Sequence, residues 1–198
     1  MKKRLPRLAD DVLPKLQVQV DRLTETDRAA VLAYYCRLSL ADRAALLGLA
    51  LPDDKLALYV NRLDFEAGGH YAARGAASVL IGVGHCTILD GQGVVTVHVA
   101  QGYRRRGIGS ALGRELMRFG RVRSLGWLRS YFNKNDPIAA GLARGLGMAL
   151  NFGIDRFYAE VALGALISAA RRPVPPRPGR ALQSAHDQSE SAEASAAA

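Results

Sequence analysis

The segment from residue 94 to residue 122 constrains the fold most, because it predicts a strand, a glycine-rich turn and a helix in immediate succession. Residues 94–99 are β-branched except for one histidine, which is typical of a strand. A run of three arginines and the glycines Gly107 and Gly109 follow. Apolar residues then recur at helical intervals, namely Ile108, Leu112, Leu116 and Phe119. We therefore predict an α/β domain with an amphipathic helix that begins near Gly107.

The turn before this helix has the features of an anion-binding site. N–H groups at a helix N-terminus point in one direction, and the helix dipole favours negative charge there. Gly107 and Gly109 let the backbone approach an anion without a Cβ in between. Arg104, Arg105 and Arg106 supply countercharge, and a guanidinium matches a phosphate in geometry. The sequence therefore predicts a phosphate-binding turn.

Two familiar phosphate-binding motifs do not match this turn. A P-loop requires Gly-Lys followed by Ser or Thr, and this turn lacks that sequence. The glycines at 102, 107 and 109 do not have the G-x-G-x-x-G spacing of a dinucleotide-binding turn. No acidic residue follows a second strand at about twenty residues, as that motif would also require.

Positive charge is concentrated around the same segment. The chain has a formal net charge of +9, and arginine supplies 22 of its 27 basic residues. Eight arginines fall between Arg104 and Arg129, where Glu115 is the only acidic residue. Such a patch favours an anionic partner, with phosphates first. The alternative is an arginine excess spread through the whole sequence without a binding role.

The rest of the central region follows an α/β pattern. We predict strands over residues 16–20, 70–74, 78–89, 93–100, 125–132 and 154–161, with a hairpin turn at 90–93. Thr24 and Ser39 precede apolar residues at helical spacing, and residues 53–63 predict a third helix. Asn135 or Asp136 is expected to cap a later helix with Pro137 in its first turn and Gly147 at its end.

Composition and length predict one domain with tails. The 198 residues are 49% apolar, which is enough for a core, and a domain typically needs roughly 100–200 residues. We expect a flexible basic N-terminus over residues 1–14, a domain over 15–163, and a largely disordered Pro/Ser/Ala-rich tail over 164–198.

The sequence favours a cytoplasmic protein. It contains no run of the roughly 18–20 apolar residues that a membrane helix needs. Asp10 and Asp11 occupy the place where a signal peptide would be apolar. Cys36 and Cys86 are expected to be buried small apolar residues, and two cysteines do not by themselves make a metal site.

Two blocks of the sequence together resemble the GCN5-related N-acetyltransferase (GNAT) superfamily. The family's (Arg/Gln)-x-x-Gly-x-(Gly/Ala) turn after a Val-rich strand reads Arg104-Arg105-Arg106-Gly107-Ile108-Gly109 here. The second block, an Asn followed by a helix and a closing Leu-Gly, reads Asn135-Asp136-Pro137-Ile138 through Leu146-Gly147, with Met148 replacing the usual Phe. The resemblance implies a mixed, mostly antiparallel sheet flanked by helices, with strands that splay at an acyl-CoA site.

The resemblance also implies a role for each matching residue. Backbone groups of Val97 and Val99 would pair with the pantetheine arm of acetyl-CoA, which is the implied co-substrate. Amides of the turn would hold the pyrophosphate, and Asn135 would contact the pantetheine or cap its own helix. Besides Val97, Val99 and Asn135, the expected cofactor-binding residues are Arg104, Arg105, Arg106, Gly107, Ile108, Gly109 and Ser110. The implied partner is an amine acceptor, and a homodimer is compatible with the family.

The catalytic residues of the family are missing from their usual positions. An acid commonly stands near the start of the fourth strand, where this chain has Gly93-Val94-Val95, and a Tyr commonly precedes Leu-Gly, where it has Ala143. His98 is a candidate base and Tyr131 a candidate acid, although each also suits an ordinary strand position. Proximity of amine and thioester, with water taking the proton, is the alternative route.

Three functions therefore stand at the end of the sequence. The first is an acetyl-CoA-dependent N-acetyltransferase, and the second is an acyl-CoA-binding sensor of the same fold without turnover. The third is a nucleic-acid-binding protein that uses the Arg104–Arg129 surface. The scarcity of aromatic residues among those arginines argues against this last function.

Overall fold

The computed structural model describes residues 19–47, 50–133, 136–152 and 157–163 of the chain. The two predicted tails, residues 1–14 and 164–198, lie outside these residues. The described strands form one seven-stranded sheet in the order β1-β2-β3-β4-β5-β7-β6. Their bounds are β1 Val20–Arg22, β2 Gly69–Arg74, β3 Leu80–Leu89, β4 Gln92–Val99, β5 Trp127–Phe132, β6 Ala149–Phe152 and β7 Phe157–Ala162.

All neighbouring strands run antiparallel except β4 and β5, which are parallel. The β3–β4 hairpin turns at Asp90 and Gly91, which both have positive φ, as the sequence predicts. The fold is therefore the mixed, mostly antiparallel α+β architecture that the resemblance implies.

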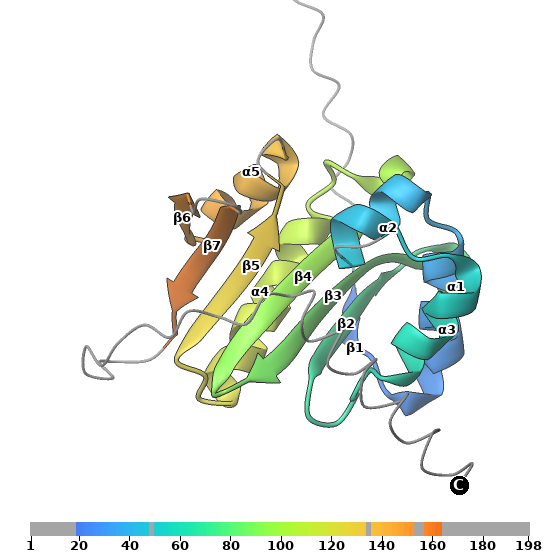
Figure 1. Cartoon of the computed structure of the whole chain (residues 1–198), viewed down its shortest axis with the longest axis horizontal. Coiled ribbons are helices and arrows are strands. Elements are labelled where there is room, and N and C mark those ends of the chain that lie inside the picture. The colour runs from blue at the N-terminus through green and yellow to red at the C-terminus, as the bar shows by residue number, and fades with distance from the viewer. Residues whose placement is uncertain (1–18, 48–49, 134–135, 153–156, 164–198) are drawn as a thin grey trace, which may run out of the picture.

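Helices cover both faces of the sheet (Figure 1). Their bounds are α1 Arg28–Cys36, α2 Leu40–Leu47, α3 Asp53–Asn61, α4 Ile108–Val122 and α5 Pro137–Gly145, with single 3₁₀ turns η1 Glu25–Asp27, η2 Ala76–Ser78 and η3 Gln101–Tyr103. The apolar stripe of α4 packs with β2, β3, β4 and β5 in one core, and residues of α1, α2 and α3 form a second core on the other face. Burial of each leucine of that stripe contributes roughly 1.5–3 kcal/mol to folding.

The helix starts follow their sequence signals. Thr24 and Asp27 form a capping box ahead of α1, and the Ser39 hydroxyl accepts a hydrogen bond from the Asp42 amide at the start of α2. Asp136 caps α5 by accepting from the amides of Ile138 and Ala139. Of the two caps that the sequence allows for α5, the structure therefore has Asp136.

The strand and cysteine predictions need adjustment. The strand predicted over 154–161 corresponds to β7, and β6 before it was not predicted; residues 153–156 lie outside the described residues. The first strand continues to Arg22, beyond its predicted end at residue 20, and residues 16–18 lie outside the described residues. Cys36 is exposed, because it ends α1 on the side away from the sheet's core, whereas Cys86 is fully buried as expected.

Candidate functional site

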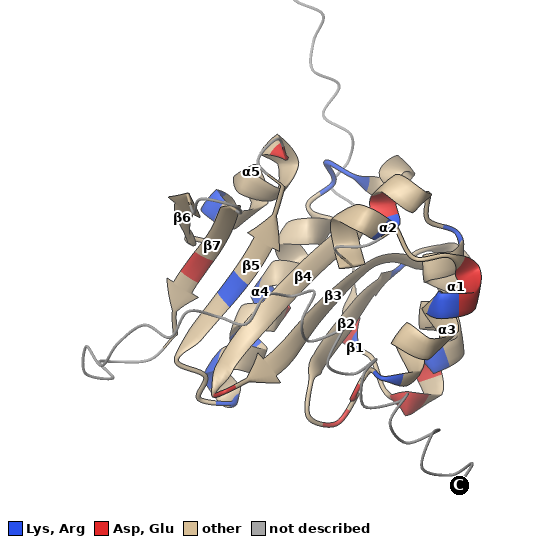
Figure 2. Ribbon diagram, viewed as in Figure 1, with Lys and Arg blue, Asp and Glu red and all other residues tan. Residues whose placement is uncertain are grey.

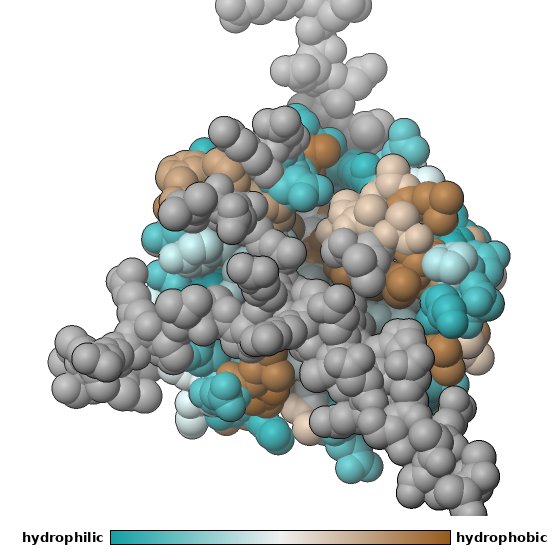
Figure 3. Space-filling view, viewed as in Figure 1, coloured by the Kyte–Doolittle hydropathy of each residue, from teal (hydrophilic) through white to brown (hydrophobic). Residues whose placement is uncertain are grey.

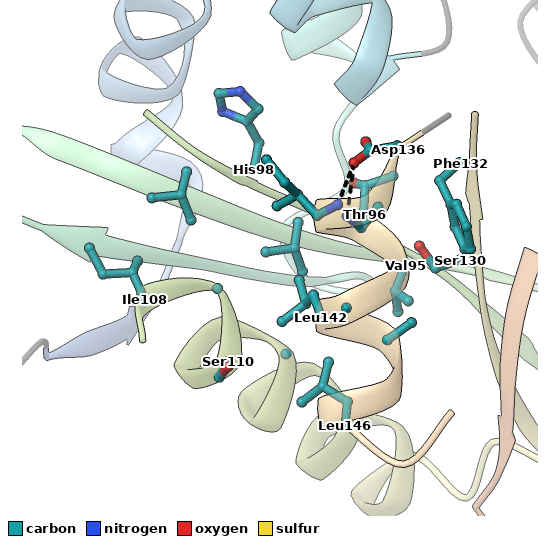
Figure 4. A pocket seen from close by; sticks show the side chains of 18 of the residues that line it. Val95, Thr96, His98, Ile108, Ser110, Ser130, Phe132, Asp136, Leu142 and Leu146 are labelled. Carbon is teal, nitrogen blue, oxygen red and sulfur yellow. Dashed lines mark hydrogen bonds between the residues drawn. The ribbon is translucent and has the colours of Figure 1, made fainter. Parts of the chain in front are cut away.

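The parallel strands β4 and β5 separate shortly after they begin to pair. Their ladder contains only Gly93 with Leu128 and Val94 with Arg129. Beyond these pairs a cavity of about 570 Å³ opens, lined by residues of β4, β5, α2, α4, α5 and the turn before α4. In the close-up its lining side chains come from both strands and from α4 and α5 (Figure 4). In the space-filling view apolar surface lies over both α5 and α2 (Figure 3).

The glycine-rich turn delivers the N-terminus of α4 to this cavity. Gly107 has a φ of +82° and Arg105 a φ of +64°, so the turn contains two left-handed residues. The first helical hydrogen bond runs from the Ala111 amide to the Gly107 carbonyl, so the preceding amides have no partner within the helix. Gly107, Ile108, Gly109 and Ser110 all line the cavity. The structure thus confirms the predicted helix start and brings these four residues together.

Arg104 lines the cavity and is also bound to groups of the protein. Its guanidinium donates to an Asp42 carboxylate oxygen at 2.6 Å and to the Val99 carbonyl at 2.8 Å, and its amide donates to the Gln101 carbonyl at 3.3 Å. Two of its guanidinium nitrogens and its amide therefore have acceptors within the protein. Arg105 is exposed, and Arg106 stacks over the Tyr103 ring at 5.8 Å. Among the described residues, Arg105 and Arg106 form no ion pair, whereas Arg104 does.

Val97 and Val99 lie on the part of β4 that has β3 on one side and no strand on the other. Their side chains pack against the α4 core, which accounts for their apolar character without any ligand. The backbone edge beside them borders the cavity. Asn135, the other residue expected at the pantetheine, lies outside the described residues.

His98 lies on the opposite face of β4 and is buried. Its imidazole projects away from Val95 and Leu142 (Figure 4). Nδ1 lies 2.7 Å from the Tyr34 hydroxyl, and Nε2 lies 3.3 Å from the Arg104 guanidinium and 3.5 Å from an Asp42 oxygen. Burial lowers the pKa of His98, and the Asp42 carboxylate opposes that shift. Both ring nitrogens therefore have neighbours within the protein.

Tyr131 lines the cavity from β5. Its hydroxyl is buried and makes no hydrogen bond of ordinary geometry with the described residues. The Arg129 guanidinium interacts with it, and the Tyr158 ring lies 6.1 Å away, centroid to centroid. Because this buried hydroxyl lies beside the cavity and has no fixed acceptor among the described residues, it can donate its proton to a group bound in the cavity.

The start of β4 carries no acid. A Cβ on Gly93 would lie 2.4 Å from Leu128 Cδ2 and 2.8 Å from the Cys86 sulfur, so a side chain there would displace these neighbours. Ala143, at the position of the family's Tyr, is buried in the wall of the cavity. Among the described lining residues the carboxylates are Asp42 and Asp136, and both are already hydrogen-bonded.

Sequence reasoning gave Asp42 no role at the site, although it lines the cavity. Its spacing of 62 residues from Arg104 leaves no local signal for their contact. In the described part of the chain, no three His, Cys, Asp or Glu side chains gather as a metal site would require. No helix there has the length and apolar character needed to cross a membrane.

Comparison with known families decides the assignment. The model of the acetyltransferase (GNAT) family matches residues 42–148, which is more than half of the chain. The chain belongs to the GNAT acetyltransferase family. Its fold supports acyl transfer, and the family resemblance of the turn and second block is confirmed. No curated protein matches the sequence significantly.

Solved GNAT structures share the fold at low identity. The GNAT domain of S. lividans PAT has 16% identity and a TM-score of 0.63, and the match covers 74% of this chain and 90% of that one. A phosphinothricin acetyltransferase from Sinorhizobium meliloti in complex with AcCoA has 16% identity and a TM-score of 0.63, covering 79% and 93%. A putative acetyltransferase from Salmonella typhimurium, solved with acetyl-CoA, has 14% identity and a TM-score of 0.58, covering 80% and 99%.

Proposed function

We propose that this GNAT protein transfers an acetyl group from acetyl-CoA to an amine of a small molecule or a protein. The observation that supports this most is the shape of the cavity, which begins where β4 and β5 separate and continues to the free amides at the start of α4. An extended thiol arm and a diphosphate fit these two parts in that order. The acetyl-CoA bound by two structural neighbours is consistent with the proposal.

The donor would be held largely by backbone groups. The pantetheine arm would lie along the open edge of β4 at Val97 and Val99, as an added strand does. The pyrophosphate would meet the amides of residues 105–110, where the positive end of α4 points. Arg105 and Arg106 would supply positive charge for the 3′-phosphate of CoA. Asn135 is proposed at the pantetheine on the family motif alone.

Acetyl transfer needs a neutral amine and a protonated leaving group. The amine nitrogen attacks the thioester carbon, the carbon–sulfur bond breaks, and the thiolate takes a proton. We assign that proton to the Tyr131 hydroxyl, because it is buried beside the cavity and makes no ordinary hydrogen bond. The amine proton passes to water, since His98 Nε2 already faces the Arg104 guanidinium. Holding both reactants in the cavity supplies much of the rate.

One observation favours a second function. The two described carboxylates that line the cavity are both engaged in hydrogen bonds, so neither is free to act as a base. An acyl-CoA sensor of the same fold would need no base at all. Its donor site would be the same, and only turnover separates the two functions.

Two measurements test the proposal in sequence. Acetyl-CoA at saturating concentration is expected to raise the Tm, because any ligand of the native state stabilises it. Free thiol release is then measured with small amines, amino acids and lysine peptides as acceptors, and with no acceptor as control. Binding without thiol release for any acceptor supports the sensor, and the absence of binding contradicts both functions.

A further inference from the structure

We infer that Asp42 is a positioning residue for the acetyl-CoA turn, acting through Arg104 rather than on the ligand. The inference rests on the proposed function, since it concerns how the proposed donor site is held. Asp42 lies on α2, and Arg104 lies between η3 and α4. In Figure 2 an acidic segment of α2 lies beside the basic turn. Their ion pair joins α2 to the turn before α4, and both residues line the cavity.

The Arg104 guanidinium ties three elements together. Its Nε donates to the carbonyl of Val99, the last residue of β4, and one terminal nitrogen donates to Asp42 on α2. The same nitrogen lies 3.3 Å from His98 Nε2. His98 Nε2 also lies 3.5 Å from the Asp42 oxygen that Arg104 contacts, so the imidazole adjoins both partners of the ion pair. Two of the three guanidinium nitrogens of Arg104 thus contact acceptors of the protein.

The turn that follows has a conformation that needs support. Arg105, which has a Cβ, adopts a left-handed φ of +64°, and Gly107 adopts +82° two residues later. A non-glycine residue in this region is strained, and it persists there when its surroundings hold it. The contacts of Arg104 with Asp42 and the Val99 carbonyl, which we call the clamp, immediately precede Arg105 in the chain. The clamp therefore fixes the chain where the strain begins. Loss of the clamp would let the turn relax and scatter the amides proposed to bind the pyrophosphate.

The ion pair is well placed to do this. The two side chains retain about a quarter to a third of their exposure, at 25% for Asp42 and 31% for Arg104. Burial raises the pKa of Asp42, but hydrogen bonds from Arg104 and Ser39 outweigh it and leave that pKa below its usual value. Asp42 is therefore charged at neutral pH and holds Arg104 throughout the range in which the protein would work.

Two readings of Arg104 give opposite results when Asp42 is changed. If Arg104 positions the turn, Asp42→Asn loosens the clamp and weakens acetyl-CoA binding. If Arg104 instead binds the 3′-phosphate, Asp42→Asn frees it and leaves binding unchanged or tighter. The ligand without the 3′-phosphate separates them again, because a clamp acts on both forms of the ligand alike.

The experiment measures Kd by calorimetry for CoA and 3′-dephospho-CoA with wild type, Asp42→Asn and Arg104→Lys. We expect both variants to weaken both ligands by the same factor, about three- to tenfold. Glu115→Gln is the matched control, because it removes the acidic partner of exposed Arg118 on α4 with the same change of charge and is expected to leave Kd unchanged. Circular dichroism verifies that each variant folds. If Asp42→Asn does not fold, the measurements on Arg104→Lys decide the question alone.

The outcomes are distinct. Unchanged or tighter CoA binding by Asp42→Asn overturns the inference, as does a loss in Arg104→Lys that is confined to CoA. If Asp42→Asn and Glu115→Gln change the Kd for CoA by the same factor, the net charge of the protein controls binding and the contacts of Arg104 do not. Wild type that binds neither ligand refutes the proposed function itself.

Discussion

The Tyr35 hydroxyl lies 2.7 Å from His85 Nε2 in the core between α1 and the sheet. His85 Nδ1 lies 2.8 Å from His70 Nδ1, and His70 Nε2 lies 2.9 Å from the Asp64 carbonyl. Burial lowers the pKa of both histidines, so both are neutral near pH 7. The carbonyl can only accept, so neutral His70 carries its proton on Nε2 and accepts at Nδ1. His85 then donates from Nδ1 and accepts at Nε2 from Tyr35, which completes a chain of hydrogen bonds.

Tyr35→Phe removes the donor at the end of this chain. His85 Nε2 would be left buried without a donor, and such a group costs about 1–3 kcal/mol of stability. We expect the free energy of unfolding, measured in urea, to fall by that amount. Tyr103→Phe is the control, because that ring is 37% exposed and its change should cost under about 0.5 kcal/mol. Equal costs for the two variants would contradict the assignment.

Acid should destabilise the protein before its carboxylates titrate. Burial lowers the pKa of His85 to about 3, from about 6.5 in an unfolded chain. The native state thus excludes a proton that the unfolded state binds, so stability is complete above pH 6.5 and falls as the pH drops below it. At pH 5 the loss from His85 is about 2 kcal/mol. Unfolding in urea between pH 8 and pH 5 measures it, and in His85→Gln the dependence should weaken by about one proton.

The phosphate-binding turn and α4 could be predicted because their signals are local. The apolar stripe repeats at helical spacing, and Gly107 takes the positive φ for which glycine is suited. β6 could not be predicted, because its burial does not alternate and Phe152 at its end is 72% exposed. A strand without an apolar face leaves no period-two pattern in the sequence.

The parts of the site that the sequence missed depend on contacts between distant residues. Arg104 was assigned to phosphate from its motif, but Asp42 lies 62 residues away and reaches it only through the packing of α2. The hydrogen bond from Tyr35 to His85 spans 50 residues in the same way. Motif spacing predicts which backbone forms the site, whereas side-chain partners follow from tertiary packing.

Substitutions at Gly107 separate backbone strain from charge. Nothing lies within 4 Å of a Cβ at this position, so a side chain meets only the cost of the left-handed conformation, which Asn tolerates well. Gly107→Asn should therefore fold and retain acetyl-CoA binding within a fewfold. Gly107→Asp has the same shape but places a negative charge at the proposed pyrophosphate site, and calorimetry should show Kd at least about tenfold weaker. Equal binding by both variants would place the phosphates elsewhere.

Tyr131→Phe tests the proposed acid. The change removes one buried hydroxyl that makes no ordinary hydrogen bond, so stability should alter little. With an acceptor identified, kcat should fall about 10²-fold while KM for acetyl-CoA stays the same. Tyr158→Phe is the control, because that ring neighbours Tyr131 on β7. An unchanged kcat in Tyr131→Phe would show that water protonates the thiolate.

The ion pair between Arg129 and Glu160 should be costly to break and cheap to replace. The two residues are register partners on β5 and β7, their closest atoms lie 2.8 Å apart, and both are buried, at 8% and 5% exposure. Arg129→Met removes the ion-pair partner on β5 from the buried Glu160 carboxylate and should cost about 3–5 kcal/mol, whereas the double variant Arg129→Met with Glu160→Leu removes both charges and should recover much of that loss. Arg118→Met, in the exposed pair with Glu115, should cost under about 1 kcal/mol. Urea unfolding of the three variants and wild type measures these costs, and a double variant less stable than Arg129→Met would show that the pair's own attraction outweighs its desolvation.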